Sequence, residues 1–130
     1  MTVVLEKLEV YQLSETLADL IWDICVTWDW FSKETIGKQL VKAVDSVGAN
    51  IAEGYGRYAF RENIQFCYYA RGSLMEVKHF LQRVKNRKLI KTEQVARINE
   101  ILLQLGPKLN AYIRSIKTEL SKTLAMTNDK

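Results

Sequence analysis

The chain has 130 residues, and apolar residues make up 48% of them, which suits a single domain with a large buried core. Its start lacks the basic region and apolar run of a signal peptide, and no apolar run approaches the roughly 20 residues of a membrane span, so we expect a soluble, cytoplasmic protein. The net charge is +4, and the isolated cysteines Cys25 and Cys67 favour buried thiols in a reducing compartment over a disulfide framework.

Apolar residues spaced three and four apart predict a first amphipathic helix over residues 5–28. The connection to the next helix spans residues 28–32, with Ser32 as the expected N-cap and Glu34 placed favourably in the first turn. A second helix follows, and Gly54 is expected to end it.

A third helix is predicted over residues 59–85, and its apolar residues cover more than one face. At 100° per residue, Tyr69 and Phe80 fall on roughly the opposite side of this helix from Leu74. A helix of this kind is usually covered on a second side, either by a neighbour in the fold or by another subunit.

A fourth helix begins at Lys91 or Thr92 after a short turn, and Gly106-Pro107 is expected to kink it. Residues 126–130 are expected to form a frayed tail, which leaves residues 1–125 as one domain. Because no segment is typical of a strand and the connections are short, we predict an all-α fold, an antiparallel up-down-up-down four-helix bundle.

The second helix carries a line of polar residues in an otherwise good helical run. Ser46, Asn50, Glu53 and Arg57 are four, three and four residues apart and so share one helical face. Serine and asparagine are poor mid-helix residues, because their side chains compete for nearby backbone groups. The line therefore predicts a specific polar contact.

The third helix offers partners for this line if it runs antiparallel to the second. Counting outward from the turn places Ser73 near Gln39, to within about one helical turn, with Glu76 one turn further on. Gly72 would let a neighbouring backbone come close. Our interpretation is a structural network in which Asn50 is buried and hydrogen-bonds across the turn, and the alternative is an exposed binding site.

Catalytic and metal-binding patterns are weak in this chain. Glu76 and His79 form one Glu-x-x-His sequence, which di-iron bundles carry on two helices, and His79 is the only histidine. No serine has a recognisable histidine partner, and no glycine-rich loop joins a strand to a helix. We therefore expect no enzymatic activity, no cofactor and no metal site.

Charge is distributed unevenly along the chain. Residues 1–30 carry six acidic residues against one lysine, whereas residues 71–97 carry eight basic residues against two acidic ones. One interpretation is a solvated surface with charged helix ends, and the other is a basic surface for a polyanion. The candidate nucleic-acid contacts are Arg83, Lys85, Arg87, Lys88, Lys91 and Arg97.

A further set of residues points to a family. These are Gly37, Gln39, Ser46, the run Asn50-Ile51-Ala52-Glu53-Gly54, Arg57, Ala70, Gly72, Ser73 and Glu76, with Leu8, Val10 and Tyr11 in the first helix. In these residues the chain resembles the small four-helix-bundle proteins known as 23S rRNA-intervening-sequence proteins. The family tends to have a proline before the second helix and paired basic residues after the Gln, where this chain has Ser32 and Val41-Lys42.

The resemblance implies a four-helix bundle and a ring-like homo-oligomer, commonly a pentamer. Members were named because their reading frames lie within insertions in rRNA genes. Similar bundles serve as accessory subunits of diversity-generating retroelements, where they bind a reverse transcriptase and nucleic acid.

We therefore expect a non-enzymatic, oligomeric helical module that binds RNA, DNA or a nucleoprotein partner through basic surfaces, with no membrane partner. The alternative is a protein–protein scaffold that binds no nucleic acid directly. The aromatic residues Trp30, Tyr69 and Phe80, if exposed, would suit contact with a protein better than contact with a phosphate backbone.

Overall fold

The structure, a computed structural model, describes residues 4–128. In this range the chain is helical and contains no strand. The elements in order are the 3-10 helix η1 (Leu5–Lys7), α1 (Glu9–Cys25), α2 (Trp30–Ser32), the π-helical segment η2 (Lys33–Gly37), α3 (Lys38–Tyr55), α4 (Phe60–Asn86) and α5 (Thr92–Asn128).

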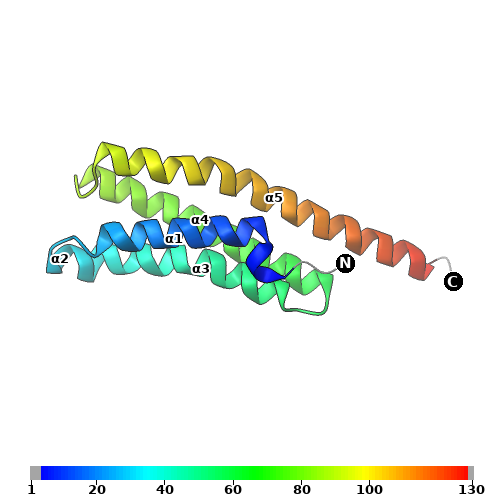
Figure 1. Cartoon of the computed structure of the whole chain (residues 1–130). Helices are drawn as coiled ribbons and strands as arrows, with labels where there is room; N and C mark the ends of the chain where they lie inside the picture. Colours follow the sequence, from blue (N-terminus) through cyan, green and yellow to red (C-terminus); the bar gives the residue numbers. More distant parts are fainter. Residues whose placement is uncertain (1–3, 129–130) are drawn as a thin grey trace.

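Four long helices, α1, α3, α4 and α5, pack side by side, and the predicted all-helical fold is confirmed. Helix α1 packs on α3 and α5, and α4 packs on the same two helices. Figure 1 shows the four running alternately in opposite directions along the chain. Helix α5, with 37 residues, is longer than the others, and its C-terminal part extends past the end of the bundle (Figure 1).

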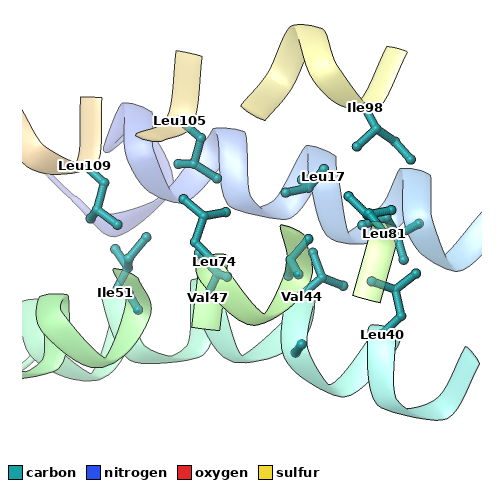
Figure 2. Packing of buried hydrophobic residues seen from close by; sticks show 14 of the residues in the cluster. Leu17, Leu40, Val44, Val47, Ile51, Leu74, Leu81, Ile98, Leu105 and Leu109 are labelled. Atoms are coloured by element: carbon teal, nitrogen blue, oxygen red, sulfur yellow. The ribbon is translucent and has the colours of Figure 1, made fainter. Parts of the chain in front are cut away.

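The core lies along the axis between the long helices, as the three- and four-residue spacing of apolar side chains requires. Figure 2 shows side chains from all four helices meeting there. Burying a leucine of this kind contributes roughly 2 kcal/mol. Residues that are almost completely buried include Leu17 and Ile21 from α1, Leu40, Val44, Val47 and Ile51 from α3, Val77 and Val84 from α4, and Ile98, Leu105 and Leu109 from α5.

Asp29, and not Ser32, caps the second helical run. The carboxylate of Asp29 accepts hydrogen bonds from the amide of Ser32 at 3.0 Å and from its hydroxyl at 2.8 Å. The bond from the Ser32 amide is the main cause that lowers the pKa of the Asp29 carboxyl. The predicted N-cap at Ser32 was wrong because the helix begins earlier, at Trp30, and continues through η2 into α3.

Gly54 lies inside α3, so the prediction that it ends the helix was wrong. The helix continues to Tyr55, and Gly56 caps it. Gly54 is buried, and a Cβ added to it would lie 2.6 Å from the side-chain oxygen of Asn63 and 2.9 Å from the Cβ of Phe66. The glycine therefore serves the close approach of α3 to α4.

Helix α5 is continuous through Pro107, and the kink at Gly106-Pro107 stays a prediction. The missing amide of Pro107 frees the carbonyl of Leu103, and the side chain of Leu103 is exposed, so water can reach this turn. The tail predicted for residues 126–130 begins inside this helix, since α5 includes residues 126–128. Residues 129 and 130 lie outside the described range.

Candidate nucleic-acid interface

The turn between α4 and α5 is held by two backbone hydrogen bonds. The amide of Lys88 donates to the carbonyl of Lys85, and the amide of Leu89 donates to the carbonyl of Val84, each at 3.1 Å. This is the Schellman arrangement that commonly ends a helix. Val84 is buried and Leu89 packs against the core, so the backbone of the turn has a fixed place on the bundle.

Lys88 adopts a φ of 58°, and it is the one non-glycine residue in the described chain with a positive φ. Its position in the Schellman turn is usually taken by glycine, which lacks the Cβ that makes this conformation unfavourable. For a lysine the strain is on the order of 1 kcal/mol. No residue pattern around Lys88 predicted this strain.

The six basic residues proposed as nucleic-acid contacts do not form one cluster. Arg87, Lys88 and Lys91 are exposed in or beside the turn, and Lys85 is the next-to-last residue of α4. Arg83 is two residues from Lys85 and so projects roughly 200° away from it around the helix. These five residues share one end of the bundle.

Arg97 is placed elsewhere. It lines a groove between α1 and α5 together with Asp19, Asp23 and Glu100. The other charged residues that line this groove are acidic, and we remove Arg97 from the candidate interface.

Lys85 lines a hollow between α4 and α5 that the sequence did not predict. Its volume is about 420 Å³, and Lys78 and the exposed Leu103 contribute to the same wall. Of the basic side chains at this end, Lys85 therefore lies at an accessible groove.

The basic residues of the turn form no ion pair with an acidic residue within the described part of the chain. The ion pairs found there are Arg57 with Glu53, Arg57 with Glu62, Lys108 with Glu9, and Lys122 with Glu119. The positive charges of Lys85, Arg87, Lys88 and Lys91 are thus uncompensated by close contacts and available to a ligand.

A groove between α1 and the start of α3 forms a second surface at this end. Apolar side chains line it, among them Trp22, Val26 and Val41, and its volume is about 330 Å³. Cys25 lies at its base, and burial raises the pKa of this thiol to about 11, so it is a weak nucleophile. Three lysines, Lys33, Lys38 and Lys42, and one acidic residue, Glu34, complete the lining.

A third hollow, also between α1 and α3, is acidic. Glu15, Asp19 and Asp45 line it. Burial, with a smaller contribution from the charge of Asp19, raises the pKa of the Asp45 carboxyl. The charge asymmetry of the sequence is therefore also an asymmetry of the surface.

Within α3, the polar line contacts α4 through two hydroxyl groups. The side-chain oxygens of Ser46 and Ser73 lie 2.8 Å apart. The Asn50 amide donates to the backbone carbonyl of Ser46 at 2.8 Å and to its hydroxyl at 3.0 Å. Asn50 is half-buried and bonds within its own helix, so the predicted hydrogen bond across the turn was wrong, and Ser46 makes the contact to α4 instead.

Nearer the turn, Arg57 continues the same line. Its guanidinium pairs with Glu53 at 2.7 Å and with Glu62 at 3.6 Å, and it lies 4.9 Å from the centre of the Phe66 ring. All three charged side chains are about half exposed, so the pairs hold the geometry of the turn more than they stabilise the fold.

The predicted register of the two helices was wrong by roughly two turns. Ser73 lies opposite Ser46, whereas the prediction placed it opposite Gln39. Gln39 lines a hollow of about 350 Å³ with Lys42, Glu76 and Phe80 instead. The first turn of α4 lies beyond the end of α3, where Glu62 pairs with Arg57. The prediction counted residues outward from the centre of the connection and so did not allow for this unpaired turn of α4.

Gly72 has open space around its α-carbon. A Cβ added there would meet no heavy atom of the described chain within 4 Å. The close approach predicted for Gly72 is therefore not made by α3 or α5. On either side along α4, Tyr69 is 50% exposed and Met75 is 61% exposed.

Glu76 and His79 do not share a site with further ligands in residues 4–127. Glu76 lies in the hollow beside Gln39, and the His79 ring makes an edge contact with Phe80 at 5.2 Å between centroids. Within the described residues, no group of three or more His, Cys, Asp or Glu side chains is placed to hold a metal ion. None of the helices described is both long and apolar enough to cross a membrane.

Comparison with known families places this arrangement. The family model for 23S rRNA-intervening sequence proteins matches residues 6–111. The chain belongs to this family. The matched range contains the polar line, Ser73, Glu76 and the basic turn, and it ends before the last part of α5 that extends past the bundle.

A solved protein structure with a similar fold supports the helical arrangement. A protein of unknown function from the S23 ribosomal protein family of Bacteroides thetaiotaomicron, whose crystal structure is solved, is 22% identical to this chain. The similarity covers 80% of this chain and 97% of that one, with a TM-score of 0.71. No curated protein matches the chain.

Proposed function

We propose that this protein is a non-enzymatic, oligomeric helical module that binds nucleic acid, or a nucleoprotein, through the basic residues of the α4–α5 turn. The observation that carries the proposal is Lys88, an exposed lysine strained at a position where glycine is favoured. A strain of this kind is explained if the lysine side chain has a ligand. Lys85, Arg87 and Lys91 surround it without acidic partners among the described residues.

Phosphate oxygens are the ligands that these side chains suit. Lysine and arginine neutralise phosphates and release the counterions condensed on the polynucleotide, so binding of this kind weakens steeply with salt. It carries little sequence information, because phosphates are alike along the strand. In an oligomer, several copies of a +4 chain would act together on one polyanion.

Gel retardation of duplex DNA and structured RNA at low salt tests the proposal. We expect the wild type to retard both ligands at micromolar concentration, and the variant Arg87→Glu with Lys88→Glu to lose most of this binding.

A matched control is Arg61→Glu with Arg114→Glu. It makes the same change in charge on exposed residues at the start of α4 and far along α5, away from the basic turn. The control should still retard the ligands. Equal loss in both variants, or no retardation by the wild type, would contradict the proposal.

We further propose that the module assembles with copies of itself, as a ring of five in line with the resemblance of its sequence. Gly72 supports this part of the proposal, because a helix-destabilising residue with open space around it suits a backbone contact from another copy. The exposed side chains of Tyr69 and Met75 extend the same surface of α4. Sedimentation equilibrium should give a mass several times that of the chain, and Gly72→Trp should reduce it without unfolding the helices.

The nucleoprotein partner that the resemblance implies is a reverse transcriptase with its nucleic acid. The basic turn would contact the nucleic acid, while another face would contact the protein. A reverse transcriptase gene beside that of this protein would identify a partner to test directly.

A protein–protein scaffold remains the second candidate, and the apolar groove at Trp22 favours it. Trp30 and Tyr69 are exposed, as that candidate requires, whereas Phe80 is half-buried and packs against the core. A pull-down that survives nuclease treatment and depends on Trp22 would favour the scaffold over the nucleic-acid module.

A further inference from the structure

Exposed aromatic rings gather at the same end of the bundle as the basic turn. Helix α1 ends and α3 begins there, and so do the end of α4 and the start of α5, as Figure 1 shows. Trp30 is 73% exposed, Phe31 is 70% exposed, and Trp22 is 55% exposed. Trp30 and Phe31 belong to the short helix α2, which comes directly before Lys33 and Glu34, two residues of the groove that Trp22 and Val26 line.

The apolar surface of the groove is bordered by positive charge. Lys33, Lys38 and Lys42 line it with Glu34 as the acidic residue, and none of the three lysines has an ion-pair partner in the described chain. A suitable occupant is therefore flat and apolar in one part and negatively charged in another. Duplex DNA does not fit this description, because its bases are stacked inside and present only edges and phosphates.

We infer that this end of the bundle binds single-stranded nucleic acid, with unpaired bases stacked on Trp30, Phe31 and Trp22 and phosphates on the neighbouring lysines. The inference rests on the proposed function and adds to it a preference for unpaired strands over duplexes. Stacking on aromatic side chains tolerates any base, since every base has a π-face, and lysines beside such rings guide the backbone. The basic turn at Lys85–Lys91 would extend the path for the strand across the end of the bundle.

Three ligands of equal length separate stacking from charge. We would titrate the protein with a fluorescein-labelled 15-nucleotide single strand, the same strand with abasic sites throughout, and the matching duplex, and follow the fluorescence anisotropy. The wild type should bind the intact strand at least about fivefold more tightly than the abasic strand, because stacking of each base on an aromatic ring accounts for that much affinity or more.

The variant Trp30→Ala with Phe31→Ala should lose most of this preference, because Trp22 is then the one ring of the three left for stacking. Both side chains are exposed, so the fold should tolerate their removal, and a thermal melt would verify this. Tyr58→Ala is the matched control, because Tyr58 is a fully exposed aromatic residue in the α3–α4 turn at the opposite end of the bundle. It should bind all three ligands as the wild type does.

The intrinsic tryptophan fluorescence gives a second readout. In a Trp22→Phe, Trp28→Phe variant, Trp30 is the one tryptophan left, and base stacking should quench its fluorescence. It should leave the emission of Trp28 unchanged in a Trp22→Phe, Trp30→Phe variant, because Trp28 is half-buried and packs against the core.

Equal affinity of the wild type for the intact and abasic strands would overturn the inference while leaving the proposed function in place. The same holds if the Trp30, Phe31 variant keeps its preference for the intact strand. Failure of the wild type to bind any of the three ligands would overturn both proposals. A glutamate-rich helical peptide with a leucine face that binds and quenches Trp30, in place of the nucleic acids, would assign this end to a protein partner.

Discussion

Ser46 of α3 and Ser73 of α4 meet hydroxyl to hydroxyl at 2.8 Å, and Asn50 donates to the same Ser46 oxygen at 3.0 Å. Ser73 is buried and Ser46 is half-buried, so folding removes water from both hydroxyls. The hydrogen bond between them replaces the bonds to water. This contact joins the polar line of α3 to α4 by a hydrogen bond, and Arg57 adds a second contact through Glu62 nearer the turn.

We expect Ser46→Ala and Ser73→Ala each to lower the free energy of unfolding by about 1 kcal/mol, because each leaves a hydroxyl without its partner. The double variant should lose less than the two single losses together. Urea denaturation of the four proteins of this double-mutant cycle would measure the coupling. Fully additive losses would show that the contact does not stabilise the protein.

Asn50→Ala should have a smaller effect than Ser73→Ala. Asn50 is half-buried and bonds to its own helix, so its removal leaves the contact between α3 and α4 intact. A loss of about 0.5–1 kcal/mol is expected from the hydrogen bonds, and the better helix propensity of alanine offsets part of it. A larger loss for Asn50→Ala than for Ser73→Ala in the same urea titration would contradict this ranking.

Gly54→Ala and Gly72→Ala should change stability in opposite directions. A Cβ at Gly54 would lie 2.6 Å from the Asn63 side-chain oxygen and 3.1 Å from the Asn63 carbonyl, so we expect a loss of about 1–3 kcal/mol. A Cβ at Gly72 would meet nothing, so the variant should gain about 1 kcal/mol from helix propensity. Thermal melts of both variants at a protein concentration low enough to avoid assembly would measure this. Equal destabilisation would mean that Gly72 is needed within the chain.

The helices could be predicted from the sequence because apolar side chains recur every three or four residues over long stretches. The contacts between helices could not, because they depend on where each helix starts and stops. Asp29 begins the second helical run earlier than Ser32 would, and Gly54 continues α3 where a glycine often ends a helix. The register of Ser73 against Ser46 was misplaced because the first turn of α4 lies beyond the end of α3, where Glu62 pairs with Arg57.

The candidate site was predicted in part. A dense run of lysine and arginine is visible in any sequence, so the turn from Lys85 to Lys91 was found. Charge counting alone could not show that Arg97 faces Asp19 and Asp23 from another groove. The sequence contains a pattern that fits the groove at Trp22, because Trp22 and Val26 are four residues apart on α1 and the aromatic pair Trp30-Phe31 follows. Apolar residues with this spacing are normally assigned to a buried core, so the groove was not predicted.

Lys88→Gly should make the protein more stable and a weaker binder. Glycine adopts the positive φ without strain, so we expect a gain of about 1 kcal/mol in the free energy of unfolding. Loss of the charge should weaken nucleic-acid binding. Lys88→Ala separates the two effects, because it removes the charge and keeps the strained conformation. Chemical denaturation and a binding titration on both variants would measure them, and unchanged binding in both would exclude Lys88 from the interface.

The Asp29 cap should make stability depend on acidic pH. The pKa of the Asp29 carboxyl is lower in the folded chain, so its contribution is present above the unfolded pKa of about 4 and is lost as the pH falls through the folded pKa. Asp29→Asn should therefore melt at a lower temperature than the wild type at pH 7. The difference should shrink at pH values below the folded pKa, where the wild-type carboxyl is also neutral. A difference in melting temperature that is the same at every pH would show that the charge of Asp29 is unimportant.

The dependence of nucleic-acid affinity on salt tests the central claim most directly. For the wild type and a 20-base-pair duplex, we predict that the logarithm of the association constant falls linearly with the logarithm of the salt concentration. Contacts to phosphate from Lys85, Arg87, Lys88 and Lys91 give an expected slope of about −4 per bound chain. Arg87→Glu with Lys88→Glu should make the slope less steep by about 2, whereas the Arg61→Glu, Arg114→Glu control should keep the wild-type slope. A wild-type affinity that does not change with salt, or the same slope in all three proteins, would contradict the assignment of the α4–α5 turn as the nucleic-acid interface.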